Sequence, residues 1–372
     1  MASLARRAVL VGVGLIGGSL GMRWKAHGAA ERVIGWGRHA SSLERAVKLG
    51  AIDEYATDLE AAVQGADVVV LCAPVAACLE LGPEVARLAP AGCLLTDAGS
   101  TKRAIAQVMT EALSHRADGT TFIGGHPMAG SERGGVDAAD PYLFENAVWV
   151  LCPPPACPPE ALGRLRALVA ETVAHALLLD AERHDRRVAW ISHLPQLAAV
   201  ALAEAAGDGA ASDEGLLGLA GGGFRDTTRI ASSPPEMWLD VLATNRDGVL
   251  VAIDGLQRRL QQLRAAVDAG DGQAVRGHFT AAAQVRAQVP ARRKGLLPAY
   301  HDLVLFVPDR PGVIGALCGA LGERGINVQD IEILRLREGE GGTLRLGFAA
   351  EAEAIAAADA LRGLGYPVQR AF

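Results

Sequence analysis

A glycine-rich segment near the start of the chain constrains the fold more than any other stretch. The apolar run 8–11 leads into Gly12, Gly14 and Gly17, which have the G-x-G-x-x-G spacing, and a helical pattern follows. Gly12 allows a tight turn out of a strand, Gly14 lets a pyrophosphate approach the backbone, and Gly17 lets the helix pack closely on the strand. The N–H groups at the helix start and the helix dipole favour phosphate. We therefore expect a dinucleotide-binding domain, with a plain structural turn as the alternative.

Strand and helix patterns alternate from the N-terminus to about residue 180. The continuous apolar run 67–75 is typical of a strand that is buried on both faces of a parallel sheet. The alternation predicts an α/β domain, 1–180, with a doubly wound Rossmann sheet and ligands at the carboxyl ends of its strands. After the first strand, the expected strands are 32–36, 67–75, 93–97, 121–124, 147–152 and 176–180.

The end of the second strand bears on the choice of cofactor. The position that usually carries a ribose-binding carboxylate is Gly37, and Arg38 follows it. Nothing there repels a 2′-phosphate, and Arg38 could pair with one, so NAD and NADP both stay open. The alternative for Arg38 is a solvated loop residue. The candidate cofactor contacts are Gly12, Gly14, Leu15, Ile16, Gly17, Arg38, Ala73 and Pro74.

Composition limits the classes of partner. The 372 residues exceed one ordinary domain, and a net charge of −6 without a basic block argues against nucleic acid or an anionic membrane surface. No apolar run approaches the length of a membrane span, so we expect none. The six cysteines form no C-x-x-C pair, so we expect a reduced, cytoplasmic protein. Without an H-E-x-x-H motif or a clustered ligand set, we expect no metal.

Two further domains follow the first. Strand patterns stop near residue 181, and helical periodicity rich in Ala, Leu and Arg predicts a helical domain, 181–295, interrupted by the glycine-rich break 221–229. We expect this domain to form a dimer interface. A linker is expected at 292–298. Residues 299–372 then show the order β-α-β-β-α-β, which is the ferredoxin-like arrangement.

Histidine and arginine side chains are the candidates for chemistry. His126 lies at an expected strand end, and histidine suits a general base because it titrates near neutral pH, although a structural role is the alternative. His184 lies in a charged run and His193 could equally cap or pack, so both are weaker candidates. Arg225 and Arg229, four residues apart, could clamp a carboxylate, or they could form an ion pair or a solvated face.

Five motifs in order resemble the prephenate/arogenate dehydrogenase family (the TyrA family). They are 12–19, 97–102, 125–132, 192–195 and 223–231, with Met237-Trp238 after the last. The resemblance implies an NAD(P)-dependent oxidoreductase of tyrosine biosynthesis that oxidises and decarboxylates prephenate. It implies that His126 is catalytic with Ser100 as its polar partner, and that Arg229 holds a substrate carboxylate near His193. Arg225 and Gln196 are further candidate substrate contacts.

The resemblance leaves the substrate and the regulation open. Some family members carry a second histidine where this chain has Gln196, so prephenate, arogenate and dual specificity all stay possible. The segments 309–312 and 325–327 make the tail similar to an ACT domain, a module that binds amino acids. This implies an effector, with tyrosine as our expectation; the alternatives are that the tail only assists assembly or that tyrosine competes at the active site. The homodimer that we expect rests on the helical domain. The candidate regulatory residues are Asp309, Pro311, Gly312 and Asn327.

Two rival functions also fit the sequence. A β-hydroxyacid dehydrogenase of similar architecture would use a lysine as its base, and Lys102 is the lysine near a strand end. A non-catalytic sensor of NAD(P) and amino acids would use the tail as its output.

Overall fold

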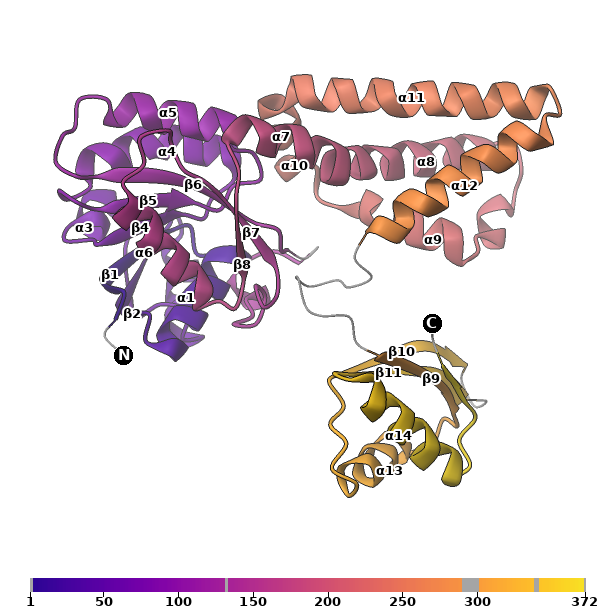
Figure 1. The fold of residues 1–372 in the computed structure, drawn as a ribbon. Helices are drawn as coiled ribbons and strands as arrows, with labels where there is room; N and C mark the ends of the chain where they lie inside the picture. Colours follow the sequence, from indigo (N-terminus) through magenta and orange to yellow (C-terminus); the bar gives the residue numbers. More distant parts are fainter. Residues whose placement is uncertain (1–2, 131–132, 290–300, 338–340, 371–372) are drawn as a thin grey trace. The chain divides into compact units, whose positions relative to one another are not determined.

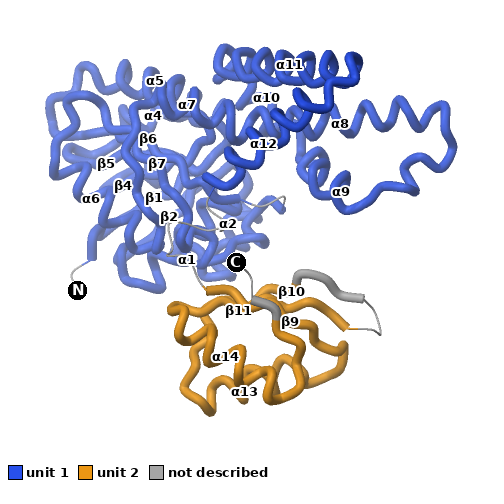
Figure 2. Tube along the Cα trace, turned by 45° about the vertical axis from the view of Figure 1, so that its right-hand side comes forward, with its two compact units in different colours: residues 1–296 blue, residues 297–372 orange. Residues whose placement is uncertain are grey.

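The computed structural model describes residues 3–130, 133–289, 301–337 and 341–370, and the chain divides into two compact units, 1–296 and 297–372 (Figures 1 and 2). The first unit holds an α/β domain and a helical domain. The second unit is a small sheet with two helices. The linker predicted at 292–298 lies outside the described residues.

An eight-stranded sheet forms the α/β domain, in the order β3-β2-β1-β4-β5-β6-β7-β8. The order reverses beside β1, which places the topological switch point between β1 and β4. This confirms the predicted doubly wound sheet of the Rossmann type. The strands are β1 (Ala5–Val11), β2 (Ala30–Trp36), β3 (Glu54–Ala56), β4 (Val68–Leu71), β5 (Leu94–Asp97), β6 (Thr121–Pro127), β7 (Val148–Cys152) and β8 (His175–Leu178).

The end of β6 differs from the prediction. Its parallel pairing with β5 ends at Ile123, and from Gly124 to Pro127 it pairs antiparallel with β7. The sheet is therefore not parallel throughout, because β7 runs against its neighbour. The added pairing extends β6 beyond the predicted end at residue 124, so His126 lies within the strand, opposite Val150.

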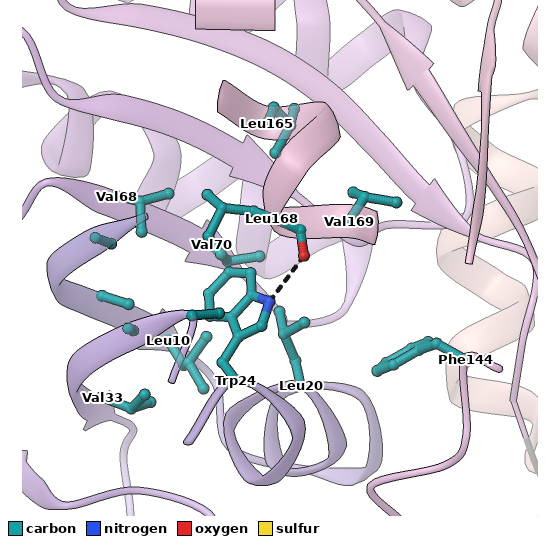
Figure 3. Close-up of a cluster of buried hydrophobic side chains, with 14 of the residues drawn as sticks. Leu10, Leu20, Trp24, Val33, Val68, Val70, Phe144, Leu165, Leu168 and Val169 are labelled. Atoms are coloured by element: carbon teal, nitrogen blue, oxygen red, sulfur yellow. Dashed lines mark hydrogen bonds between the residues drawn. The ribbon is translucent and has the colours of Figure 1, made fainter. Parts of the chain in front are cut away.

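Helices cover both faces of the sheet and bury its alternating side chains. Leu10 belongs to the core beneath one set of helices, whereas Val9 and Val11 belong to the core on the other face. On the first face, the Trp24 indole packs in the apolar core, and its Nε1–H donates to the carbonyl of Leu168 at 3.0 Å (Figure 3). The helices are α1 (Leu15–His27), α2 (Ala40–Lys48) and α6 (Pro159–Ala170) on this face, and α3 (Leu59–Val63), α4 (Val75–Leu88) and α5 (Arg103–Leu113) on the other.

The helical domain begins with one long continuous helix (Figure 1). α7 (Ala181–Val188) passes through a π-helical turn, Ala189–His193, into α8 (Leu194–Ala210). This run was not expected from the sequence, and by length and composition alone it could cross a membrane. Its buried polar side chains instead bond to other parts of the first unit, as described below. The remaining helices are α9 (Gly222–Thr228), α10 (Pro235–Thr244), α11 (Arg246–Asp268) and α12 (Gly272–Gln288).

The glycine-rich segment 221–229, predicted to be a break between helices, forms the short helix α9 instead. Its glycines have open space around them, with no atom within 4 Å of an added Cβ at 221, 222 or 223. The segment was misread because glycine disfavours helix only by about 1 kcal/mol, which the neighbouring helix α8 can offset by packing.

The second unit has the predicted β-α-β-β-α-β order. Its sheet order is β10-β11-β9-β12, with all described pairs antiparallel. Leu303, Leu305, Leu344 and Leu346 alternate along the strands and face the two helices, which bury them. The elements are β9 (His301–Val307), α13 (Val313–Gly322), β10 (Asp330–Arg337), β11 (Gly341–Phe348), α14 (Glu351–Gly363) and β12 (Val368–Arg370).

Candidate active site

The glycine loop has the geometry of a phosphate cradle. Gly12 has φ +98°, in the region that favours glycine, and a Cβ there would lie 2.8 Å from the carbonyl oxygen of Cys72. A Cβ on Gly17 would lie 2.2 Å from the carbonyl oxygen of Gly12, so the helix can pack here only without a side chain. Gly14 has open space, and it precedes α1 without a side-chain cap. The free N–H groups of the helix start therefore face room for a pyrophosphate, which fits a dinucleotide.

The other candidate cofactor contacts surround this loop. Leu15 and Ile16 form the first turn of α1. Ala73 and Pro74 follow β4, on the other side of the switch point, and Pro74 precedes α4. Arg38 follows β2 and is exposed, and within the described ranges it makes no ion pair. Its role toward the cofactor stays a prediction.

The helical domain closes against the same edge of the sheet. The Asp240 carboxylate of α10 accepts a hydrogen bond from the Ala76 N–H at 3.0 Å, at the N-terminus of α4. The hydroxyl groups of Thr101 and Thr244 lie 2.8 Å apart. These contacts hold α10 next to the loops that follow β4 and β5.

His126 is the first member of a hydrogen-bonded chain that enters the helical domain. Its Nδ1 lies 2.8 Å from Nε2 of His184, and Nδ1 of His184 lies 2.7 Å from Oδ1 of Asp185. His184 is completely buried, whereas His126 is only partly exposed. Sequence reasoning gave His184 a low rank because it lies in a charged run. Its spacing from Val188 could have revealed it, since both occupy the buried face of α7.

Asp185 anchors this chain to the α/β domain. Its Oδ1 accepts the Lys102 N–H at 2.7 Å, and its Oδ2 accepts the Arg103 N–H at 2.9 Å. The carboxylate thus binds the N-terminus of α5, where the helix dipole stabilises negative charge. Asn245 Nδ2 donates to the backbone carbonyl of Asp185 at 2.7 Å. The chain is therefore held rigidly from both domains.

Burial keeps His126 and His193 neutral near pH 7. Burial lowers the pKa of His126 well below 6.5, and the positive charges of His184, Lys102 and His193 would act in the same direction. The pKa of His193 is lowered to about 4, again mainly by burial and despite the opposing effect of Asp185. A neutral His126 can accept a proton, which is what a general base requires.

Lys102 is committed to a buried ion pair. Its ammonium contacts Oδ2 of Asp97, and neither side chain is exposed. Asp97 also accepts the N–H groups of Gly99 at 2.9 Å and Gly125 at 3.0 Å. An ammonium enclosed in this way cannot reach a substrate, which removes the lysine base that a β-hydroxyacid dehydrogenase would need.

Ser100 lies just beyond β5, at the edge of the sheet where His126 also lies, and it is half-buried. In the part of the chain that the structure describes, no hydrogen bond joins Ser100 to His126. The polar partner that the structure gives His126 is His184. The role of Ser100 stays a prediction.

A cavity of about 520 Å³ is lined by residues of the helical domain and by Gly130 of the α/β domain, and the candidate substrate arginine is part of its lining. Gln196 is buried in its wall, and its Nε2 donates to the carbonyl of Ile230 at 2.8 Å. The Trp238 indole N–H is buried and has no hydrogen-bond partner among the described residues. The cavity lining includes Gly130, Ser192, Gln196, Arg229, Met237 and Trp238. Guanidinium and indole donors suit an anionic ligand.

Direct contacts connect the His126 chain to this cavity. Nδ2 of Asn245, which holds the Asp185 carbonyl, lies 3.3 Å from Nδ1 of His193. The His193 ring packs edge-to-face on the Trp238 ring, with centroids 6.0 Å apart. His193 is thus buried between the base and the cavity. Arg225 is exposed on α9 and is not among the cavity lining, so its role stays a prediction.

The candidate regulatory residues lie around the start and the end of α13. Asp309 borders a small cavity of about 70 Å³ in the second unit. Pro311 and Gly312 precede α13, and Gly312 has φ +86°. Asn327 follows the helix and is exposed. Within the described ranges, no group of three or more His, Cys, Asp or Glu side chains is placed to hold a metal.

A glycine cradle at the switch point, a buried neutral histidine and an arginine-bearing cavity define a nicotinamide-dinucleotide-dependent dehydrogenase. Family models agree with this class. The model described as prephenate dehydrogenase, nucleotide-binding domain matches residues 20–178, and the model described as prephenate dehydrogenase, dimerization domain matches 180–281. An ACT domain model matches 301–358.

Individual relatives give the same result. A prephenate dehydrogenase of Bacillus subtilis is 36% identical over 344 residues, which is 92% of each chain. A crystal structure of prephenate dehydrogenase from A. aeolicus, in complex with hydroxyphenyl propionate and NAD+, has TM-score 0.71 and 28% identity, covering 76% of this chain and 98% of that one. A crystal structure of Synechocystis arogenate dehydrogenase has TM-score 0.66 and 31% identity, covering 76% of this chain and 99% of that one. This chain belongs to the prephenate dehydrogenase family.

Proposed function

We propose that this enzyme oxidises and decarboxylates prephenate to 4-hydroxyphenylpyruvate and CO₂. The observation that carries the proposal is the neutral, partly exposed His126, connected through His193 to a cavity that contains Arg229. Prephenate has a hydroxyl group for such a base and carboxylates for such an arginine. The B. subtilis relative, named a prephenate dehydrogenase, supports this substrate.

The residues divide the reaction between proton transfer and positioning. A bound nicotinamide ring supplies the acceptor for the hydride from ring C4. His126 takes the proton of the C4 hydroxyl, a contribution of about 10²–10⁴-fold for a general base. Arg229 holds a substrate carboxylate through its planar fork, and Ser100 orients the hydroxyl. The ring carboxylate then leaves as CO₂, its electron pair makes the ring aromatic, and the ring oxygen takes the proton back from His126. The main task of the protein is therefore alignment.

Arogenate is the second candidate substrate, and one contact favours it. The Gln196 amide nitrogen is engaged by the Ile230 carbonyl, which leaves Oε1 as the polar atom available to the cavity. A carbonyl oxygen accepts hydrogen bonds, so it suits the ammonium of arogenate better than the corresponding keto group of prephenate. The relative named arogenate dehydrogenase supports keeping this alternative.

The experiment that tests the function follows absorbance near 340 nm. The purified full chain is mixed with prephenate or arogenate and with NAD⁺ or NADP⁺. We expect a rise with prephenate, and the ratio of the two cofactors measures what Gly37 and Arg38 contribute. No rise with either substrate and either cofactor would overturn the proposal and favour the sensor function.

We further propose that the second unit binds an amino acid, with tyrosine as the effector. The ACT family match and the position of Asp309 beside a small cavity support this. Tyrosine inhibition should disappear when residues 298–372 are deleted, because the proposed effector site is then removed. The truncated enzyme should still fold, because the first unit has its own cores. Inhibition that survives the deletion would place tyrosine at the active site instead.

We also propose a cytoplasmic homodimer formed through the helical domain. The dimerization-domain match supports the assembly, and so do large apolar side chains that are exposed on its helices. Ile191, Leu239 and Phe279 are 70%, 61% and 71% exposed in the single chain. Sedimentation of the full chain at micromolar concentration should give twice the monomer mass.

A further inference from the structure

A buried pair of residues, His184 and Asp185, lies directly behind the proposed base. We propose that these two are positioning residues that fix the tautomer of His126, so that its Nε2 is the basic nitrogen. The inference rests on the proposed function of His126 as the general base. Among the described residues, neither His184 nor Asp185 belongs to the lining of the cavity that contains Arg229.

The argument begins with the Asp185 carboxylate, which can only accept hydrogen bonds. Two backbone N–H groups, those of Lys102 and Arg103, donate to it at 2.7 and 2.9 Å. A backbone N–H has no acceptor capacity, so a proton on the carboxylate would find no acceptor in these two groups. The N-terminus of α5 also favours the ionised form. Because Oδ1 of Asp185 lies 2.7 Å from Nδ1 of His184, that nitrogen carries its hydrogen.

The tautomer of His184 then determines which ring nitrogen of His126 carries the hydrogen. A neutral imidazole has one donor and one acceptor nitrogen. With its Nδ1 donating to Asp185, His184 presents Nε2 as an acceptor. The nitrogen 2.8 Å away is Nδ1 of His126, which therefore donates. The remaining nitrogen of His126, Nε2, is left with its lone pair free for the substrate hydroxyl proton.

The packing makes this arrangement rigid. His184 is completely buried and Asp185 is 3% exposed, so water does not compete for their hydrogen bonds. After proton transfer, the imidazolium of His126 keeps its Nδ1–H bond to His184, and Asp185 supplies the balancing negative charge. In hydrolases with a Ser-His-Asp arrangement, loss of the orienting carboxylate lowers turnover by about 10⁴-fold because the wrong tautomer forms.

The test compares two substitutions of His184 in the full chain. His184→Phe removes the acceptor that faces His126, and we expect kcat for prephenate to fall by about 30-fold or more while KM stays within about threefold. His184→Gln keeps a carbonyl oxygen that can accept from His126, so it should retain kcat within about tenfold. Glu182→Gln, on the exposed face of the same helix, is the matched control and should behave as wild type.

A spectrum separates positioning from a merely structural role. Histidine ¹⁵N shifts of the full chain without substrate should show His126 protonated at Nδ1 in the wild type and in His184→Gln. His184→Phe should populate the Nε2–H form. Because no substrate is present, this readout stands even if prephenate is the wrong substrate, which the wild-type rate tests separately.

Three results would overturn the inference. The first is wild-type His126 protonated at Nε2. The second is a His184→Phe variant with kcat within threefold of wild type. The third is a His184→Phe variant whose kcat, cofactor affinity and unfolding temperature all fall together while the tautomer of His126 is unchanged.

Discussion

Replacement of Lys102 by methionine should destabilise the first unit by about 3 kcal/mol. The lysine and Asp97 are both completely buried and form an ion pair. Removing one partner of such a pair leaves an uncompensated charge, which costs about 3–5 kcal/mol. Methionine nearly matches the lysine stem in length, so a cavity adds little. Asp97 would keep its bonds from the Gly99 and Gly125 N–H groups, which is why the lower end of the range applies.

This loss is large enough to measure by thermal unfolding. At about 2–4 °C per kcal/mol for a domain of 150–250 residues, the midpoint should fall by roughly 6–12 °C. Circular dichroism near 222 nm follows the helices of the first unit. The same substitution at Lys48, which is exposed on α2, should change stability by less than about 0.5 kcal/mol and is the control.

A double variant tests the cause of the effect. Asp97→Asn combined with Lys102→Met removes both charges, so its loss should be smaller than the sum of the two single losses. A Lys102→Met variant that loses less than 1 kcal/mol would refute the reasoning. So would strictly additive losses, because the charges would then be independent of each other.

Three further predictions concern catalysis and use initial rates at 340 nm. His126→Asn should lower kcat by about 10²–10⁴-fold with KM nearly unchanged, since asparagine cannot accept the proton. Arg229→Ala should raise KM by roughly 10–100-fold with little change in kcat, because it removes a charged hydrogen bond whose free energy corresponds to that factor. Equal, small effects in the His126 and Arg229 variants would refute the two roles. Because burial holds the pKa of His126 well below 6.5, its inactivating protonation requires a more acidic pH, so kcat/KM should stay level from pH 8 down through 6.5. Half-maximal loss at pH 6.5 would contradict this.

The glycine loop was predictable because its physics is local. A turn with positive φ, a close backbone approach and an uncapped helix start each need glycine within a few residues, and the structure shows these at Gly12, Gly17 and Gly14. The ferredoxin-like tail was predictable for a similar reason, since alternating apolar residues such as those of β9 define one buried face.

The partner of His126 was not predictable from local pattern. His184 follows His126 by 58 residues, and charged residues surround it in the sequence. Its burial depends on the docking of α7 against α5, which Asp185 secures. The direction of β7 was missed because a short apolar run has the same composition in either orientation, and only its pairing with β6 sets the direction. Ser100 was placed beyond a strand end by the sequence pattern, but its role comes from the resemblance alone and stays a prediction.

The π-helical turn between α7 and α8 sets how α8 is rotated about the helix axis relative to α7. His184 and Gln196 lie on one continuous helix, about 18 Å apart at 1.5 Å per residue, with the turn Ala189–His193 between them. Such a turn accommodates one residue more than an α-helical turn, so the same residues wound as a regular α-helix would rotate the segment that follows by about 100°. Gln196 would leave the cavity wall, and His193 would lose its contacts with Asn245 and Trp238, while His184 stayed beside His126. The rotation of α8 relative to α7 therefore decides whether the same helix can support both the proton acceptor and the wall of the substrate cavity.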